Sequence, residues 1–282
     1  MICRMFCHAR NSTMRNAHCL AAIFWLAITP IAAAITPATL PSVKPGLTDP
    51  VKKEIAMQLV SAAENSSLDW KAQYGYIEYN VEHNATENRG YTAGIVGFTS
   101  KTDDLLAVVQ LYDQLEPQNV LSKYLPALRK ADGTPSKIGL GKDFERDWKA
   151  AANDPKFREA QDRERDRLYF DPAVTLAQAD GLHELGQFAY YDAAVMHGSC
   201  DSIRAAVMRI AKTPTQGGDE ILYLNAFLDA RIVAMKREEA HSDVSRVETQ
   251  QREFLRQGNL TLTLPLNFKT YGDAYMIERS GR

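Results

Sequence analysis

The sequence predicts a mainly helical α+β protein with two lobes, and two observations carry this prediction. Over most of residues 102–257, apolar residues recur at spacings of three and four, a pattern typical of amphipathic helices. Only the short stretch 89–98 combines β-forming residues with three glycines, so it is the one predicted strand or hairpin region. A small β element followed by many helices favours a small lobe and a helical lobe, and the cleft between two lobes is a natural binding site.

The first predicted helix begins at Pro50, with Asp49 as its N-terminal cap. One face of this helix is apolar at four-residue spacing, and the stripe consists of Ile55, Leu59 and Ala63. Glu64 stands at the end of the stripe. The aromatic spacing within residues 67–78 predicts a second helical stretch or a continuation of the first.

The rest of the chain is predicted to be helical with few interruptions. Thr102 is the predicted cap of the helix that follows the β region. Prolines and glycines separate the later helices from one another. Those helices are expected over about 119–130, 143–152, 155–168, 172–197, 201–212, 218–239 and 243–257.

The N-terminal segment differs in charge from the rest of the chain. The first 48 residues contain basic residues but no acidic one, whereas acids and bases are interleaved afterwards. A basic stretch that ends at Arg15 is followed by an apolar run over 19–28, by a proline and by three alanines at 32–34. This order is typical of a secretory signal peptide, and the apolar run is too short to favour a spanning helix. We therefore expect cleavage after Ala34 and a secreted, extracellular protein.

The predicted domain organisation follows from this segment. Residues 1–34 are the expected signal peptide, 35–47 a proline-containing linker, and 48–282 one folded domain of two lobes. Met14 begins a complete signal peptide by itself, so translation from Met1 and from Met14 both remain open. Signal cleavage would leave 30 basic and 35 acidic residues. Because the mature chain is mildly acidic, we expect no nucleic-acid partner, and we expect no membrane contact after cleavage.

Cysteine and motif content exclude several classes of function. Cys3, Cys7, His18 and Cys19 run directly into the apolar signal core, so we expect no metal site there. Cys200 would then have no internal disulfide partner, and its surroundings favour a small half-buried residue. The chain lacks GxGxxG, GxxxxGK[ST], HExxH and GxSxG motifs, which leaves dinucleotide, phosphate-loop, zinc-peptidase and serine-hydrolase sites without their anchors. We expect a monomer that needs no cofactor.

Carboxylate chemistry remains. Hydrolysis of a polysaccharide needs two carboxyl groups, one protonated to donate to the leaving oxygen and one ionised to activate water or to attack. Glu64 ends an apolar stripe and has Leu68 and Trp70 nearby in the sequence, and partial desolvation there would favour the protonated form. A glutamate at a helix end is more commonly solvated, so the pattern alone leaves both interpretations open.

One series of motifs runs in order along residues 48–276. It starts with Glu54-Ile-Ala-Met57 and with the segment from Leu59 to Tyr74, Leu-Val-Ser-Ala-Ala-Glu-Asn-Ser-Ser-Leu-Asp-Trp-Lys-Ala-Gln-Tyr. Its later members are Arg89-Gly-Tyr-Thr92, Leu115-Glu-Pro117, Lys123-Tyr-Leu-Pro-Ala-Leu128, Glu164-Arg-Asp-Arg167, Tyr169-Phe-Asp-Pro-Ala173, Gly186-Gln-Phe-Ala-Tyr-Tyr-Asp192, Val195-Met-His-Gly198, Gln216-Gly-Gly-Asp-Glu220, Tyr223-Leu-Asn225, Phe227-Leu-Asp-Ala-Arg231, Gly258-Asn-Leu260 and Lys269-Thr-Tyr-Gly-Asp273. Together these segments closely resemble the chitosanases of glycoside hydrolase family 46.

The resemblance implies a lysozyme-like fold with two lobes, and an enzyme that cuts β-1,4 bonds within chitosan, a cationic glucosamine polymer, with inversion at the anomeric carbon. Glu64 would be the general acid, and Thr92 would help to hold the attacking water. The family has its general base, an aspartate, just before the Arg-Gly-Tyr-Thr motif, where this chain has a glutamate after a longer loop. Glu87 is therefore the expected base, and Glu82 is a competitor.

The resemblance also implies a charged network around the acid. Asp192, Arg231 and Arg246 would form it, and such a network restrains the acid and tunes its proton affinity. The alternative is that the two arginines are ordinary surface residues.

Four further residues are candidates for binding or support. Asp104 and Glu238 correspond to family positions that bind glucosamine ammonium groups, although as bare residues they would be a helix-start aspartate and a solvated glutamate. Arg89 would help to fix the base beside the water. His197 is expected at a helix end, where it is either a helix cap or a substrate contact.

Two other functions remain open. A lysozyme-like cleft could act on N-acetylated peptidoglycan, which comparison of deacetylated and acetylated polymers would distinguish. The altered base also leaves room for a catalytically impaired polysaccharide-binding protein, which would bind without releasing product.

Overall fold

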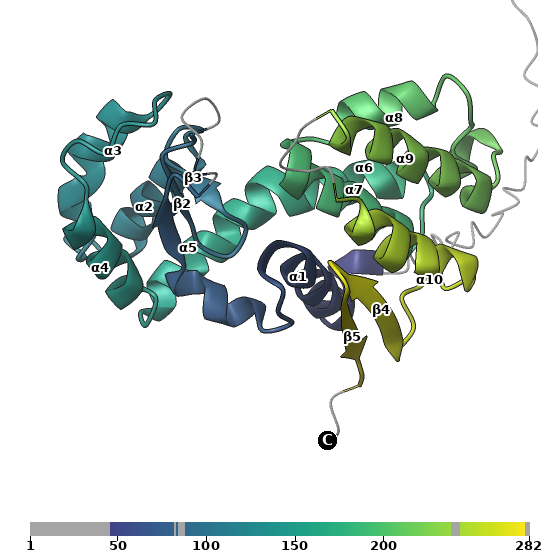
Figure 1. Cartoon of the computed structure of the whole chain (residues 1–282), viewed down its shortest axis with the longest axis horizontal. Coiled ribbons are helices and arrows are strands. Elements are labelled where there is room, and N and C mark those ends of the chain that lie inside the picture. Colours follow the sequence, from purple (N-terminus) through teal and green to yellow (C-terminus); the bar gives the residue numbers. More distant parts are fainter. Residues whose placement is uncertain (1–45, 82, 84–87, 238–242, 280–282) are drawn as a thin grey trace, which may run out of the picture. The chain divides into compact units, whose positions relative to one another are not determined.

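The computed structural model describes residues 46–81, 83, 88–237 and 243–279, and all of them belong to one compact unit. It confirms the prediction of a mainly helical α+β fold. In Figure 1 the sheet β1–β3 and helices α2–α4 lie on one side of this unit, helices α6–α10 lie on the other, and α5 runs between them. The predicted signal peptide and nearly all of the predicted linker lie outside the described residues.

Helix α1, Pro50–Asn65, has the cap that the sequence predicts. The Asp49 carboxylate accepts hydrogen bonds from the amides of Val51 and Lys52, which would otherwise lack partners in the first turn. The apolar stripe is buried in the core. The helix ends where Ser66 turns into the left-handed region, at φ 50°. Glu64 therefore lies in the last turn of α1.

The helix expected over 67–78 is partly wrong. Only Trp70–Gly75 is helical, as a short 3-10 turn, and the chain then enters strand β1, Ile77–Tyr79. β1 pairs antiparallel with β2, Tyr91–Ala93, which pairs with β3, Phe98–Thr99. The predicted β region over 89–98 is thus confirmed, but the strand that completes the sheet comes from a segment whose aromatic spacing resembled that of a helix.

Helices α2–α5 pack beside this sheet, at Asp104–Leu115, Leu125–Ala131, Lys142–Ala151 and Pro155–Arg165. The prediction that Thr102 caps α2 is wrong. The residue at the cap position is Asp103, in the left-handed region at φ 69°. The Thr102 hydroxyl instead donates to the side chain of Asp104.

The helical side contains more breaks than the sequence indicated. A π-helical turn, Asp166–Phe170, joins α5 to α6, Asp171–Ala179. The single helix expected over 172–197 is divided, because Gly181 adopts φ 81° before α7 begins, and the remaining helices are also shorter than expected. These elements are α7, Glu184–His197, α8, Asp201–Val207, α9, Glu220–Met235, a π-helical segment, Arg246–Gln251, and α10, Arg252–Arg256.

The structure adds a second β element that the sequence analysis missed. Strands β4, Leu266–Thr270, and β5, Asp273–Ile277, form an antiparallel hairpin after α10. Buried and exposed residues alternate along β4, which is the signal that could have identified it.

Gln161 holds the β2–β3 connection against α5. Its side chain is fully buried, accepts a hydrogen bond from the amide of Ile95 at 3.2 Å and donates to the carbonyl of Tyr74 at 2.9 Å. Gly94 lies against it: a Cβ atom there would stand 2.4 Å from Gln161 Oε1. The backbone of Gly94 is also left-handed, with φ 76°. The connection therefore depends on a glycine both for its conformation and for its closeness to Gln161.

Gly94→Ala should destabilise the protein more than Gly133→Ala. Gly133 has nearly the same φ, 74°, but a Cβ atom there would meet nothing within 4 Å. Both variants should lose about 1 kcal/mol from the left-handed backbone, and Gly94→Ala should lose roughly 1–3 kcal/mol more from overpacking. Urea unfolding measures both losses, and equal losses would contradict the contact with Gln161.

Candidate active site

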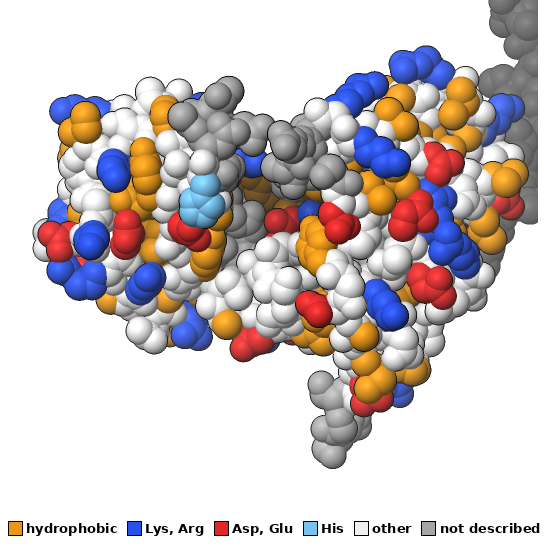
Figure 2. Space-filling model, viewed as in Figure 1, with side chains coloured by type: hydrophobic (Ala, Val, Ile, Leu, Met, Phe, Trp, Pro, Cys, Tyr) orange, Lys and Arg blue, Asp and Glu red, His pale blue; other side chains and the backbone are white. Residues whose placement is uncertain are grey.

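An open cleft of about 1010 Å³ brings together five of the predicted site residues. Its walls come from the end of α1, strands β2 and β3, the start of α2 and the end of α7. Figure 2 shows the molecule hollowed in this region, with acidic side chains beside the hollow. The predicted residues that line it are Glu64, Arg89, Thr92, Asp104 and His197.

A second depression has a similar volume, about 1060 Å³, and extends along α5 and α6. Volume therefore does not decide which concavity is the site. None of the predicted site residues lines the second depression, and two of its four acidic residues, Glu164 and Asp166, are paired with Arg167 and Arg165. The chemistry of the lining residues favours the cleft at the end of α1.

Glu64 stands at the wall of the cleft with its side chain 33% exposed. Its Oε1 atom accepts a hydrogen bond of 2.6 Å from Nη1 of Arg246, whose side chain is only 2% exposed. The guanidinium group therefore approaches Glu64 from the protein interior, while the carboxyl group still reaches the cleft. This charge-assisted contact fixes one oxygen of the carboxyl group.

Behind Glu64 lies the network that the sequence analysis expected. Nη2 of Arg246 donates to Oδ1 of Asp192 at 2.6 Å, and Nη1 of Arg231 lies 2.6 Å from Oδ2 of the same carboxylate. Asp192 and Arg231 are fully buried. The alternative that Arg231 and Arg246 are ordinary surface arginines is therefore wrong.

The two guanidinium groups determine the ionisation of Asp192. Burial by itself raises the pKa of this carboxyl group, because the charged form loses its hydration. The adjacent charges of Arg231 and Arg246, with their hydrogen bonds, outweigh burial and lower the pKa to about 2. Asp192 is consequently ionised at any pH at which the protein would work, and it compensates part of the buried positive charge.

Gln251 is a member of the network that the sequence analysis did not identify. Its amide donates to Oδ2 of Asp192 at 2.6 Å and accepts from Nη1 of Arg231 at 3.2 Å. It is fully buried at the end of the π-helical segment that begins with Arg246. A glutamine in a helical sequence pattern carries no signal of such contacts.

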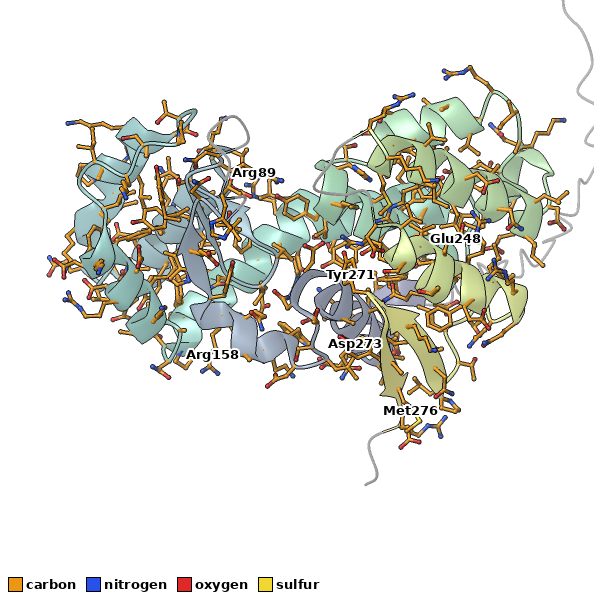
Figure 3. The ribbon with its side chains drawn as sticks, viewed as in Figure 1. Arg89, Arg158, Glu248, Tyr271, Asp273 and Met276 are labelled. Atoms are coloured by element: carbon orange, nitrogen blue, oxygen red, sulfur yellow. The ribbon has the colours of Figure 1, made fainter. Side chains whose placement is uncertain are left out.

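Thr92 lies in β2, opposite Glu78 of β1. Its hydroxyl oxygen is buried and has no hydrogen-bond partner among the described residues. Arg89, which precedes β2, also lines the cleft, and Figure 3 shows it on the side of the sheet. Glu82 and Glu87, the two candidate bases, lie outside the described residues.

Asp104 lies at the start of α2, at the cleft wall, and is only 7% exposed. Its carboxylate accepts hydrogen bonds from the amides of Thr99 and Leu105 and from the hydroxyls of Thr102 and Tyr169. Burial raises its pKa, and these donors act in the opposite direction. The donors orient the carboxylate, so it is a fixed feature of the wall.

His197 is the last residue of α7, as expected, and is followed by Gly198 in the left-handed region. Both residues line the cleft. Glu238, the other predicted ammonium-binding residue, lies outside the described residues. Tyr271, in the turn between β4 and β5 (Figure 3), interacts electrostatically with Glu64, and the sequence analysis did not single it out.

Tyr271 is held at this position by the π-helical region. Its amide donates to the hydroxyl of Ser245 at 2.8 Å. Burial raises the pKa of the phenol, the charge of Arg246 lowers it, and the charge of Glu64 raises it. The C-terminal hairpin thus extends into the electrostatic environment of Glu64.

The described residues contain no group of three or more histidine, cysteine or carboxylate side chains arranged to hold a metal ion. Within the same residues, no helix has the length and apolar character needed to cross a bilayer. Cys200 is buried, and burial raises the pKa of its thiol to about 12.

An open cleft with carboxyl groups on its walls is the arrangement used by glycoside hydrolases. The model of glycosyl hydrolase family 46 matches residues 58–266, and the chain belongs to this family. It is 61% identical to a chitosanase of Streptomyces sp. strain N174, over 82% of this chain and 84% of that protein.

Solved structures agree with the family assignment. A co-crystal structure of chitosanase OU01 with substrate matches with TM-score 0.78 and 51% identity, covering 83% of this chain and 99% of that one. The family 46 chitosanase of Gynuella sunshinyii in complex with chitotetraose matches with TM-score 0.72 and 32% identity, covering 80% and 97%.

Asp192→Asn should destabilise the protein most at neutral pH. The folded pKa of about 2 lies below the ordinary value of 3.8, so the stabilisation from ionised Asp192 is complete above about pH 5 and is lost as the pH falls through 2. The difference in free energy of unfolding between parent and variant should therefore shrink by roughly 2 kcal/mol between pH 6 and pH 2. Urea unfolding of both proteins at each pH cancels the general effect of net charge. A difference in free energy of unfolding that stays constant with pH would contradict the conclusion that the two arginines lower the pKa of Asp192.

Proposed function

We propose that this protein hydrolyses β-1,4 bonds between glucosamine units of chitosan by an inverting mechanism, with Glu64 as the general acid. The observation that carries the proposal is the placement of Glu64 at the cleft wall with a buried arginine bound to one of its oxygens. The chitosanases to which the chain is similar supply the substrate class. Family membership favours this activity over hydrolysis of peptidoglycan.

On the leaving-group side, Glu64 gives its proton to the glycosidic oxygen as the bond from that oxygen to the anomeric carbon breaks. Because Arg246 binds Oε1, we assign the transferred proton to Oε2. The leaving sugar departs as an alcohol, and Glu64 becomes a carboxylate. The guanidinium group of Arg246 stabilises the negative charge that forms.

In the same displacement, a water molecule attacks the anomeric carbon from the opposite face, and a base removes its proton. We propose Glu87 as this base, with Glu82 as the competitor, and Thr92 as the residue that holds the water. Thr92 lines the cleft and its hydroxyl oxygen has no hydrogen-bond partner among the described residues, which supports the role in water binding. An inverting pair needs carboxyl groups roughly 6.5–9.5 Å apart, so that the water fits between them.

A fixed carboxylate at the cleft wall suits a cationic polymer. Asp104 lines the cleft and is held in place by its hydrogen bonds. We propose that Asp104 and Glu238 bind ammonium groups of the sugar, that His197 contacts the chain near the acid, and that Arg89 fixes the base. We also propose that residues 1–34 are removed and that the protein acts outside the cell, since its polymeric substrate cannot enter the cell. We propose that the protein is a monomer.

Glu64→Gln keeps the shape of the side chain but removes the proton that can be transferred. Release of reducing ends from chitosan should therefore fall at least about 10²-fold, while binding of chitosan oligomers persists. Glu54→Gln is the matched control, because Glu54 also lies on α1 but bonds to the indole of Trp70 outside the cleft.

Retention of most activity by Glu64→Gln would refute its role as the acid. Turnover of acetylated but not of deacetylated polymer by the parent would indicate a peptidoglycan hydrolase. Binding without release of reducing ends by the parent would indicate an impaired binding protein.

Glu87→Gln should reduce turnover strongly, and Glu82→Gln only weakly, because Glu87 is close in the chain to Arg89 and Thr92. Kinetics on both variants and NMR of the first anomer released from chitosan oligomers are the measurements. A large loss at Glu82 with little at Glu87 would transfer the role of base to Glu82. Release of the anomer with retained configuration would exclude an inverting mechanism.

A further inference from the structure

We infer that Gln251 is a positioning residue that keeps Arg246 on the general acid through Asp192, and the inference rests on the proposed role of Glu64. Gln251 touches neither the cleft nor Glu64. Its contacts are with the two groups behind Arg246: it donates to Oδ2 of Asp192 at 2.6 Å and accepts from Arg231 at 3.2 Å.

These contacts fix the rotation of the Asp192 carboxylate. Oδ1 of Asp192 receives Arg246, and Oδ2 receives both Gln251 and Arg231. If the carboxylate rotated, Oδ1 would leave the position from which it holds Nη2 of Arg246. The other end of the same guanidinium group binds Glu64. The amide of Gln251 therefore acts on Glu64 through two intervening side chains.

The local helix geometry explains how residues 246 and 251 reach one carboxylate. In an α-helix, side chains five positions apart point about 140° away from each other. The segment Arg246–Gln251 is instead π-helical, and the amide of Arg252 bonds to the carbonyl of Val247, five residues earlier. The wider turn brings the first and last residues of the segment toward the same side.

The neighbouring residue Gln250 offers a matched control. It is also a fully buried glutamine of the π-helical segment, but its amide donates to the backbone carbonyl of Leu59 at 3.1 Å. Substitution at either position removes a buried amide of the same size. Only substitution at Gln251 removes a partner of Asp192.

The charged groups around Gln251 and Asp192 influence how activity depends on pH, so they must be taken into account in the test. These charged and titratable groups come from α1, α7, α9, the π-helical segment and the C-terminal hairpin. They are Glu64, Tyr191, Asp192, Arg231, Arg246 and Tyr271. Gln251→Met adds or removes no charge in this cluster, and methionine has nearly the same volume as glutamine.

The test compares Gln251→Met with Gln250→Met in chitosan hydrolysis, at a temperature at which both are folded. Loss of a hydrogen bond to a charged group should lower kcat of Gln251→Met about tenfold, with KM little changed because Gln251 does not touch substrate. The rate of Gln251→Met should begin to fall at a higher pH than the rate of the parent, because Arg246 then stabilises the ionised form of Glu64 less well. Gln250→Met should keep the parental profile.

Gln251→Glu gives an independent readout if Gln251→Met does not fold. A protonated glutamic acid can donate to Asp192 and accept from Arg231 as glutamine does, whereas an ionised one would repel Asp192. Its kcat relative to the parent should therefore fall as the pH rises.

The inference is overturned if Gln251→Met matches Gln250→Met in kcat and profile, or if the relative kcat of Gln251→Glu is independent of pH. If Glu64→Gln is inactive in the same experiments, either result refutes the role of Gln251 but not the role of Glu64 as the acid. Failure of this inference is therefore distinguishable from failure of the proposed function.

Discussion

The buried guanidinium group of Arg246 is the constraint on which the site depends. A charge this deeply buried costs several kcal/mol unless it is paired and hydrogen-bonded. Its partners are Glu64 from α1 and Asp192 from α7, and Asp192 is held in turn by Arg231 from α9. Four helical segments must therefore converge before all of these charges are compensated. The same convergence that stabilises the helical side of the protein also fixes the proposed acid.

The opposite wall of the cleft is held by backbone pairing and close packing, not by paired charges. Thr92 and Arg89 belong to the small antiparallel sheet, which Gln161 and Gly94 hold against α5. Hydrolysis by two carboxyl groups requires both walls to hold the substrate and water in one geometry. A charged network therefore fixes the proposed acid, while backbone pairing and close packing fix the region proposed to hold the water.

The sequence allowed much of this arrangement to be predicted, because the relevant signals are local. The cap at Asp49 and the stripe along α1 place Glu64 without reference to the rest of the chain. The β4–β5 hairpin was missed although β4 alternates between buried and exposed residues. Gln251 could not have been found, because its role depends on a π-helical turn and on partners from distant helices. A sequence pattern typical of a helix does not show which of its buried polar residues make such long-range contacts.

The cluster also has a charge balance that suits proton donation. Its side chains alternate in sign in the order Glu64, Arg246, Asp192 and Arg231. While Glu64 carries its proton, two buried guanidinium groups face a single carboxylate, and one positive charge is uncompensated. In the proposed reaction, Glu64 gives its proton to the leaving oxygen and the cluster becomes neutral, a state that a low-dielectric interior favours. The guanidinium group of Arg246, bound to Oε1, stabilises the conjugate base of Glu64 as the bond breaks, which lowers the barrier to donation.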